Sequence, residues 1–151
     1  MGDASDIDRD FVLPFPIEFL IQQTPRSFQS KNARAKEEWK LVVRQAAKDC
    51  IADQRELTWL DDRPLAAKIL YFAPAPMDGD VDNIVKLILD GMLKIVYPDD
   101  RVVERVMVQK IEPGMIIEFA SITRKLGEAI EAKYPVVHVR IDDDLNWRDI
   151  T

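Results

Sequence analysis

The sequence is poor in the residues that zinc sites, disulfides and redox centres require. It holds one cysteine and one histidine in 151 residues, so an intrachain disulfide is excluded and a Cys/His zinc site has too few ligands. The single thiol, Cys50, fits a reducing cytoplasm, where we expect the protein to reside. His138 lies in an apolar run and is expected to be a packed or surface residue. No G-x-G-x-x-G or P-loop pattern occurs, so a nucleotide cofactor is not implied.

Long apolar runs and targeting signals are also missing. No run approaches the ~18 apolar residues of a transmembrane span, so no membrane association is expected. Residues 1–10 are acidic, lack the features of a signal peptide and are predicted to be disordered. The length fits one domain, which we bound at residues 11–141, with a core over 11–120, an extension over 121–141 and an acidic tail over 142–151.

The charge is negative overall, with a net value of −6, which argues at first sight against a partner rich in phosphate. Residues 1–25 carry a net −4 and residues 141–151 a net −3, whereas residues 26–48 carry a net +5. This basic stretch is a candidate phosphate-binding surface, while the acidic ends set the low pI. The alternative is a solvated helix face of mixed charge. The first four basic residues of the stretch are Arg26, Lys31, Arg34 and Lys36.

The hydrophobic periodicity alternates between strand and helix patterns, which indicates an α+β fold. We expect a mixed, mostly antiparallel sheet with two main helices packed on it, plus a C-terminal helix–strand extension. The first helix carries an apolar stripe over 39–51 and is capped by Ser30 or Asn32. The other expected helices lie at about 82–94 and 123–134, and the expected strands at 11–16, 65–72, 102–111, 115–120 and 136–141.

Acidic residues gather on both sides of the second helical segment. Asp80 and Asp82 come at alternate positions where it begins, and Asp99 and Asp100 follow it, ahead of a strand-like run. A chain that folds back from both ends of one helix onto a strand brings such residues together. Carboxylate oxygens suit a hard divalent cation, and Mg²⁺ takes only one or two of them along with waters and substrate phosphates. The pattern therefore indicates a metal-dependent enzyme that acts on phosphodiesters.

Lys86 strengthens this interpretation. It lies four residues after Asp82, so the two side chains share one face of the expected helix, with Asp90 one turn further on. The helix macrodipole disfavours a cation near the N-terminus, so stability does not explain the lysine. Beside a metal-bound phosphate it can neutralise developing charge or position the attacking water. Taken singly, each acidic pair could instead be a helix cap or a turn.

The same residues resemble a known family. The run Asp80-Val81-Asp82-Asn83-Ile84-Val85-Lys86, then Asp90 and then Asp99-Asp100, looks like the D-x-D-N-x-x-K…D…DD motif of the RusA family of Holliday-junction resolvases. The expected order of elements over about residues 11–120 is similar as well: a strand with Pro14-Phe15-Pro16, a basic loop and helix, a strand, the motif helix and a hairpin.

The resemblance implies a homodimeric endonuclease that uses Mg²⁺, or alternatively Mn²⁺, to nick four-way DNA junctions in symmetric pairs. The basic residues of 26–36 would then contact DNA. Which of the two adjacent acids is the metal ligand stays open. Two other functions also stay open: a catalytically weak resolvase-like protein that binds nucleic acid or protein, and a nuclease for RNA or single strands. The implied site residues are the metal-binding and catalytic Asp80, Asp82 and Asp100, the catalytic Lys86, and the supporting Asn83 and Asp99.

Overall fold

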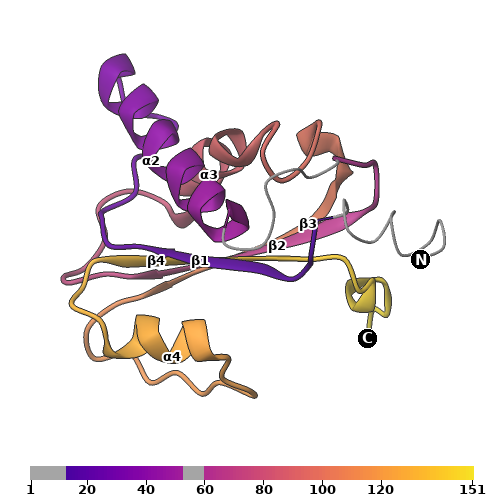
Figure 1. Cartoon of the computed structure of the whole chain (residues 1–151). Coiled ribbons are helices and arrows are strands. Elements are labelled where there is room, and N and C mark those ends of the chain that lie inside the picture. Colours follow the sequence, from indigo (N-terminus) through magenta and orange to yellow (C-terminus); the bar gives the residue numbers. More distant parts are fainter. Residues whose placement is uncertain (1–12, 53–59) are drawn as a thin grey trace, which may run out of the picture.

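The computed structural model describes residues 13–52 and 60–151, so the predictions for residues 1–10 and for the first two residues of the strand expected at 11–16 lie outside the described residues. A four-stranded sheet forms the middle layer, with α2 and α3 on one face and α4 on the other (Figure 1). The elements are β1 (Ile17–Ile21), α2 (Ala33–Ala52), β2 (Leu65–Phe72), η1 (Val81–Ile84), α3 (Val85–Met92), η2 (Asp100–Val102), β3 (Val103–Ile111), α4 (Arg124–Glu131), β4 (Val136–Asp142) and η3 (Asn146–Arg148).

The strands are ordered β1-β4-β2-β3. β4 is antiparallel to both of its neighbours, β1 and β2, whereas β3 is parallel to β2. The predicted α+β fold with a mixed, mostly antiparallel sheet is therefore confirmed. The strand that we expected within a C-terminal extension lies in the centre of this sheet, so the last strand of the chain is part of the core.

The parallel pair β2 and β3 is joined by a crossover that carries the acidic motif. Parallel strands need such a connection because a tight turn cannot join them. The chain leaves the sheet after Phe72, passes through η1, α3 and η2, and re-enters it at Val103. Because α3 packs against α2, the whole crossover lies on the α2 face of the sheet.

α2 is an amphipathic helix with a well-defined start. The side chain of Asn32 accepts the N–H of Ala35 at 3.0 Å and so caps the helix, as one of the two expected caps. Its buried residues recur at every fourth position, which keeps them on one stripe facing the sheet. They are Ala35, Trp39, Val43, Ala47 and Ile51.

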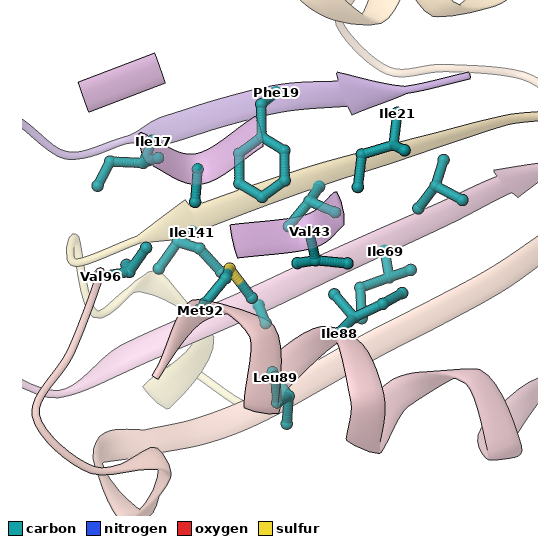
Figure 2. Packing of buried hydrophobic residues seen from close by; sticks show 14 of the residues in the cluster. Ile17, Phe19, Ile21, Val43, Ile69, Ile88, Leu89, Met92, Val96 and Ile141 are labelled. Atoms are coloured by element: carbon teal, nitrogen blue, oxygen red, sulfur yellow. The ribbon is translucent and has the colours of Figure 1, made fainter. Parts of the chain in front are cut away.

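α3 crosses α2 at a point of close approach. A Cβ on Gly91 would lie 2.7 Å from the Cβ of Val43, so no larger residue fits there without movement of a helix. Figure 2 shows Val43, Ile88 and Met92 packed together over the strand residue Ile69. The α2/α3 face thus holds the larger hydrophobic core, and it supports the crossover directly.

The opposite face of the sheet holds a smaller apolar cluster. Leu70, Phe72 and Val136 of the strands meet Leu126 and Ala129 of α4. None of the helices in the described ranges is both long and apolar enough to cross a bilayer.

A polar network around the buried His138 lies beside this small cluster. One carboxylate oxygen of Glu18 is 2.6 Å from Thr123 Oγ1, which donates to it, and 2.6 Å from His138 Nε2. His138 is 1% exposed and is therefore a packed residue, with its Nδ1 lacking a partner among the described residues. Burial lowers the pKa of His138, although the contact with Glu18 opposes the shift. The imidazole is accordingly neutral at pH 7 and donates from Nε2.

Two of the expected strands are wrong. Residues 13–16 are irregular because Pro14 and Pro16 lack the N–H that a ladder needs, and the strand begins at Ile17 instead. Residues 115–120, expected to return antiparallel to the preceding strand, form no regular structure and lead to α4. The helix expected at 82–94 exists as η1 followed by α3, over 81–92.

Candidate active site

The acidic motif begins in the loop after β2. Gly79 takes a φ of 81°, in the left-handed region that favours glycine, and the chain then turns into η1. Asp80 precedes η1 in an extended conformation, but its side chain makes no capping hydrogen bond. Asp80 and Asp82 are exposed, and their carboxylates make no hydrogen bond or ion pair with the described part of the chain. The structure therefore gives them no capping role, and both face solvent.

Lys86, Asp90 and Asp100 form a polar cluster next to this start. Lys86 Nζ lies 2.9 Å from Asp90 Oδ1, one helical turn further along α3, and 3.1 Å from Asp100 Oδ2. Hydrogen bonds to Asp90 and then Asp100 raise the pKa of Lys86, so its ammonium group stays charged. The Lys86 side chain is 49% exposed, which leaves it open to a ligand from solvent. The fold thus joins two parts of the motif that are 14 residues apart.

The adjacent acids Asp99 and Asp100 have different partners. Asp99 Oδ1 accepts the N–H of Arg101 at 2.9 Å and so caps η2. This hydrogen bond lowers the pKa of Asp99. Asp100 instead points to Lys86. Of the two candidate metal ligands left open by the sequence, Asp100 is the one that contacts Lys86, whereas Asp99 stabilises the turn before β3.

The loop before α2 contacts the motif through the backbone. The N–H of Phe28 donates to the carbonyl of Asn83 in η1 at 2.7 Å. Lys36 of α2 donates from Nζ to the carbonyl of Phe28 at 3.2 Å, and the same ammonium lies 5.4 Å from the centroid of the Phe28 ring. The basic loop and the start of the motif therefore lie side by side, with Asn83 contributing its backbone.

The four predicted basic residues differ in their surroundings. Lys36 is held by the loop, and Arg34 pairs with Glu38 at 3.0 Å on the exposed side of α2. Arg26 and Lys31 are both exposed on the loop itself. Arg26 and Lys31 therefore lie on the loop that contacts η1, whereas Arg34 lies on α2 and is ion-paired.

The structure does not gather the three predicted metal ligands into one closed group. Within residues 13–52 and 60–151, no three Asp, Glu, His or Cys side chains are placed so that they could hold a metal ion. Asp100 is engaged by Lys86, and Asp80 and Asp82 are not grouped with it. The donors themselves are all carboxylate oxygens, which fit Mg²⁺ or Mn²⁺ rather than a softer metal. Mg²⁺ also needs only one or two protein carboxylates when substrate phosphates complete its shell.

Sequence reasoning missed two residues that hold the loops of this site. Glu112 Oε2 accepts the N–H of Met77 at 2.6 Å, which ties the loop before Asp80 to the end of β3. Tyr97 is buried and donates its hydroxyl to the carbonyl of Leu89 at 2.6 Å, which fixes the turn before η2. Burial raises the pKa of Tyr97, so the hydroxyl keeps its proton. Neither residue stands in a local pattern that predicts its partner.

Comparison with known proteins agrees with this arrangement. A sequence model of the family described as Endodeoxyribonuclease RusA matches residues 17–119, which is more than half of the chain. A search of curated proteins gives no match. The matched range begins at β1 and includes the basic loop, the crossover and the Lys86 cluster. The chain therefore belongs to the RusA family of endodeoxyribonucleases.

Proposed function

We propose that the protein is a Mg²⁺-dependent endonuclease that resolves Holliday junctions by paired phosphodiester hydrolysis. Membership of the family indicates a nuclease that acts on Holliday-junction DNA. The observation that supports the finer statement is the cluster of Lys86 with Asp90 and Asp100, which follows two solvent-facing carboxylates in the same crossover. An ammonium group and several carboxylates combined in this way suit cleavage of a phosphodiester.

Asp80, Asp82 and Asp100 are the proposed ligands of Mg²⁺, with Mn²⁺ as the alternative ion. Such an ion supplies a water of lowered pKa and polarises a phosphoryl oxygen when it is bound. Lys86 would stabilise negative charge on the scissile phosphate, because its raised pKa keeps it protonated. Asp90 holds the Lys86 ammonium from within the same helix, so this side chain stays oriented when Asp100 turns to another partner.

The DNA would approach from the side of the basic loop. Arg26 and Lys31 are exposed there, and Lys36 contacts the same loop at Phe28. Contacts of these residues with phosphates would release counterions, so binding should weaken steeply as salt rises. A four-way junction has two equivalent strands to cut, and a two-fold homodimer would supply one site for each.

A second candidate is a resolvase-like protein that binds nucleic acid or protein and cuts weakly. The observation in its favour is that no closed group of three metal ligands is present in the described ranges. The net charge of −6 also opposes tight binding to a polyanion.

The direct test is incubation of the purified protein with a synthetic four-way junction and Mg²⁺. We expect paired nicks in opposed strands and loss of nicking in Asp82→Asn. A suitable control is Asp149→Asn, because this exposed acid lies outside the family match. Absence of nicks, or nicking by Asp82→Asn at the wild-type rate, contradicts the nuclease proposal.

A binding measurement separates the two candidates. Isothermal titration with Mn²⁺ should show a site in the wild-type protein that Asp82→Asn weakens and Asp149→Asn leaves unchanged. Junction binding without nicking and without a Mn²⁺ site would support the second candidate instead.

A further inference from the structure

A small pocket lies beside the start of the acidic motif. It has a volume of about 210 Å³ and is formed between the loop after β1 and the loop that leads from β2 to Asp80. This volume is below the ~300–1,000 Å³ of pockets that hold whole small molecules, so it suits a single planar ring system. Its lining includes Ser27 of the first loop, Ala75, Met77 and Asp78 of the second, Tyr71 of β2 and Ile84 of η1.

Both loops that form the pocket are tied to other elements. The N–H of Phe28, in the first loop, donates to the carbonyl of Asn83 in η1 at 2.7 Å. The N–H of Met77, in the second loop, donates to Glu112 Oε2 at 2.6 Å. These hydrogen bonds are made within the protein and need no ligand, so the pocket is pre-formed.

The hydroxyl of Tyr71 is the feature of this pocket that packing does not explain. Tyr71 is 4% exposed, and it belongs to the larger hydrophobic core together with Ile84. Within residues 13–52 and 60–151 its hydroxyl makes no hydrogen bond, yet it is not among the fully enclosed polar atoms that lack a partner. The oxygen therefore keeps contact with solvent, and the pocket is where Tyr71 opens to it. A phenylalanine would fill the same core position, so the hydroxyl indicates a ligand.

The groups around the pocket match a nucleobase. The Tyr71 hydroxyl can donate or accept, and the Ser27 hydroxyl, which accepts the N–H of Gln29 at 3.0 Å, can still donate its own proton. The exposed Asp78 carboxylate can accept from an exocyclic amino group. The apolar side chain of Ile84 suits the face of a ring. Few polar groups within apolar walls are what a flat heterocycle requires.

The position of the pocket favours a base that belongs to the DNA. Asp78 lies two residues before Asp80, and Ile84 lies two residues after Asp82, so the pocket adjoins the acidic motif. The exposed Arg26 belongs to the loop that forms the opposite wall, where it can contact a phosphate of the same strand. Extrusion of a base is costly in an intact duplex and least costly where the base is mismatched or unpaired. A branch point can therefore supply such a base.

We propose that this pocket binds one nucleobase, extruded from the DNA beside the branch point and adjacent to the scissile phosphate. The base forms hydrogen bonds with the Tyr71 hydroxyl and with Asp78, while its phosphate stays at the acidic motif. The inference deepens the proposed function and rests on it, because it takes DNA as the substrate. It also explains how the site distinguishes branched from intact DNA, since capture of the base is favourable only where the base leaves its stack easily.

The fluorescence of 2-aminopurine, a base analogue that brightens when it leaves the stack, provides the test. The analogue is placed in turn at each position that flanks the branch point of a synthetic four-way junction, without divalent metal so that the strands stay intact. At saturating wild-type protein we expect a roughly threefold or greater rise at one position, and no rise in a linear duplex of the same sequence. The analogue carries an exocyclic amino group, so it can also contact Asp78.

Two variants show whether the brightened base occupies the pocket. Ala75→Phe adds bulk at an exposed position of the wall and should abolish the rise. Tyr71→Phe removes one hydroxyl without a partner, so it should leave thermal unfolding unchanged while it weakens junction binding by about fivefold. Tyr134→Phe is the matched control, because it removes the hydroxyl that donates to the carbonyl of Ile130 on the α4 side, and its fluorescence rise should equal that of wild type.

No rise at any position, a rise that survives in Ala75→Phe, or wild-type binding by Tyr71→Phe would each overturn the proposal. The fluorescence needs no cleavage, so it is independent of nuclease activity. A rise that depends on the pocket in a protein that never nicks junctions therefore contradicts the proposed function alone. Normal nicking without a rise contradicts the pocket alone, and a protein that does not bind the junction contradicts both.

Discussion

The two faces of the sheet differ in how they are filled. On the α2/α3 face the buried side chains are apolar, and they form one cluster that runs from β1 across β4 and β2 to both helices. On the α4 face a small apolar cluster shares the surface with Glu18, Thr123 and His138, which are joined by hydrogen bonds. Close packing of apolar side chains holds each of them in one position. The acidic motif starts from the better-packed face, so its backbone is anchored where the core is largest.

The largest expected effect is a cavity on the α2/α3 face. Ile88→Ala should lower the free energy of unfolding by about 3–4 kcal/mol, because Ile88 is fully buried between α3 and the sheet. Leu126→Ala on the other face should cost about 2 kcal/mol, at the low end for such truncations. Urea denaturation followed by circular dichroism measures both. Equal losses of unfolding free energy in the two variants would contradict a difference in packing between the two faces.

Glycine substitutions should give opposite signs on the two faces. Gly91→Ala should destabilise by about 1–3 kcal/mol, because the new Cβ would overlap Val43. Gly127→Ala in α4 should stabilise by about 0.5–1 kcal/mol, since its Cβ would meet nothing closer than Ile122 Cγ2 at 3.7 Å and alanine favours the helix. Thermal unfolding of the two variants, which differ from wild type by one methyl group, makes this comparison directly. A stabilising Gly91→Ala would show that the helices are not in tight contact.

The polar network should make stability depend on pH. In the folded protein the pKa of His138 lies below 6.5, its ordinary value in an unfolded chain. As the pH falls below 6.5, the unfolded chain therefore binds a proton at His138 before the folded protein does. Stability is therefore complete above about pH 6.5 and is lost as the pH falls toward the folded pKa, with a slope of at most about 1.4 kcal/mol per pH unit. His138→Gln should flatten this slope. Because His138 is the sole histidine in the chain, an unchanged slope in the variant would contradict its burial in the neutral form.

The smallest effect is expected at the C-terminal segment. The contacts with Arg148 and Trp147 lower the pKa of Glu104 to about 2, so the carboxylate stays ionised in all but strong acid. Glu104→Gln should speed hydrogen exchange at the backbone amides of Arg148 and Asp149, which close the turn of η3, and leave global unfolding unchanged. Exchange measured by mass spectrometry, with Asp144→Ala as a comparison within the segment, reports this local loosening. A fall in global stability would mean that η3 is part of the core.

Much of the fold could be predicted from local patterns. The strand predicted at 65–72 has the same bounds in the structure, and the apolar stripe predicted for α2 is buried. Ile17, Phe19 and Ile21 alternate with more polar residues as a strand requires. The strand was nevertheless predicted at 11–16, in the apolar run that contains the two prolines, and not at 17–21. The parallel pairing of β2 and β3 and the central place of β4 depend on contacts between distant segments, which no local period encodes.

In the candidate site, too, some features could be predicted from the sequence and others depend on contacts between distant segments. The motif spacing predicted that Lys86 and the acids before and after it belong together, and the structure places Lys86 against Asp100. The assignment of Asp80, Asp82 and Asp100 as metal ligands stays a prediction. The difference between Asp99 and Asp100 could not be predicted, because it depends on which carboxylate caps η2. Glu112 and Tyr97 act through backbone partners on other elements, so no motif marks them.

The position of β4 has a consequence for biosynthesis. β1 and β2 do not pair with each other, since β4 lies between them. During translation the ribosome must therefore release residues 136–142 before the sheet can close; until then β1 has no strand partner, and β2 can pair only with β3. A message that stops short of this segment yields a product in which the strand that joins β1 to β2 is missing.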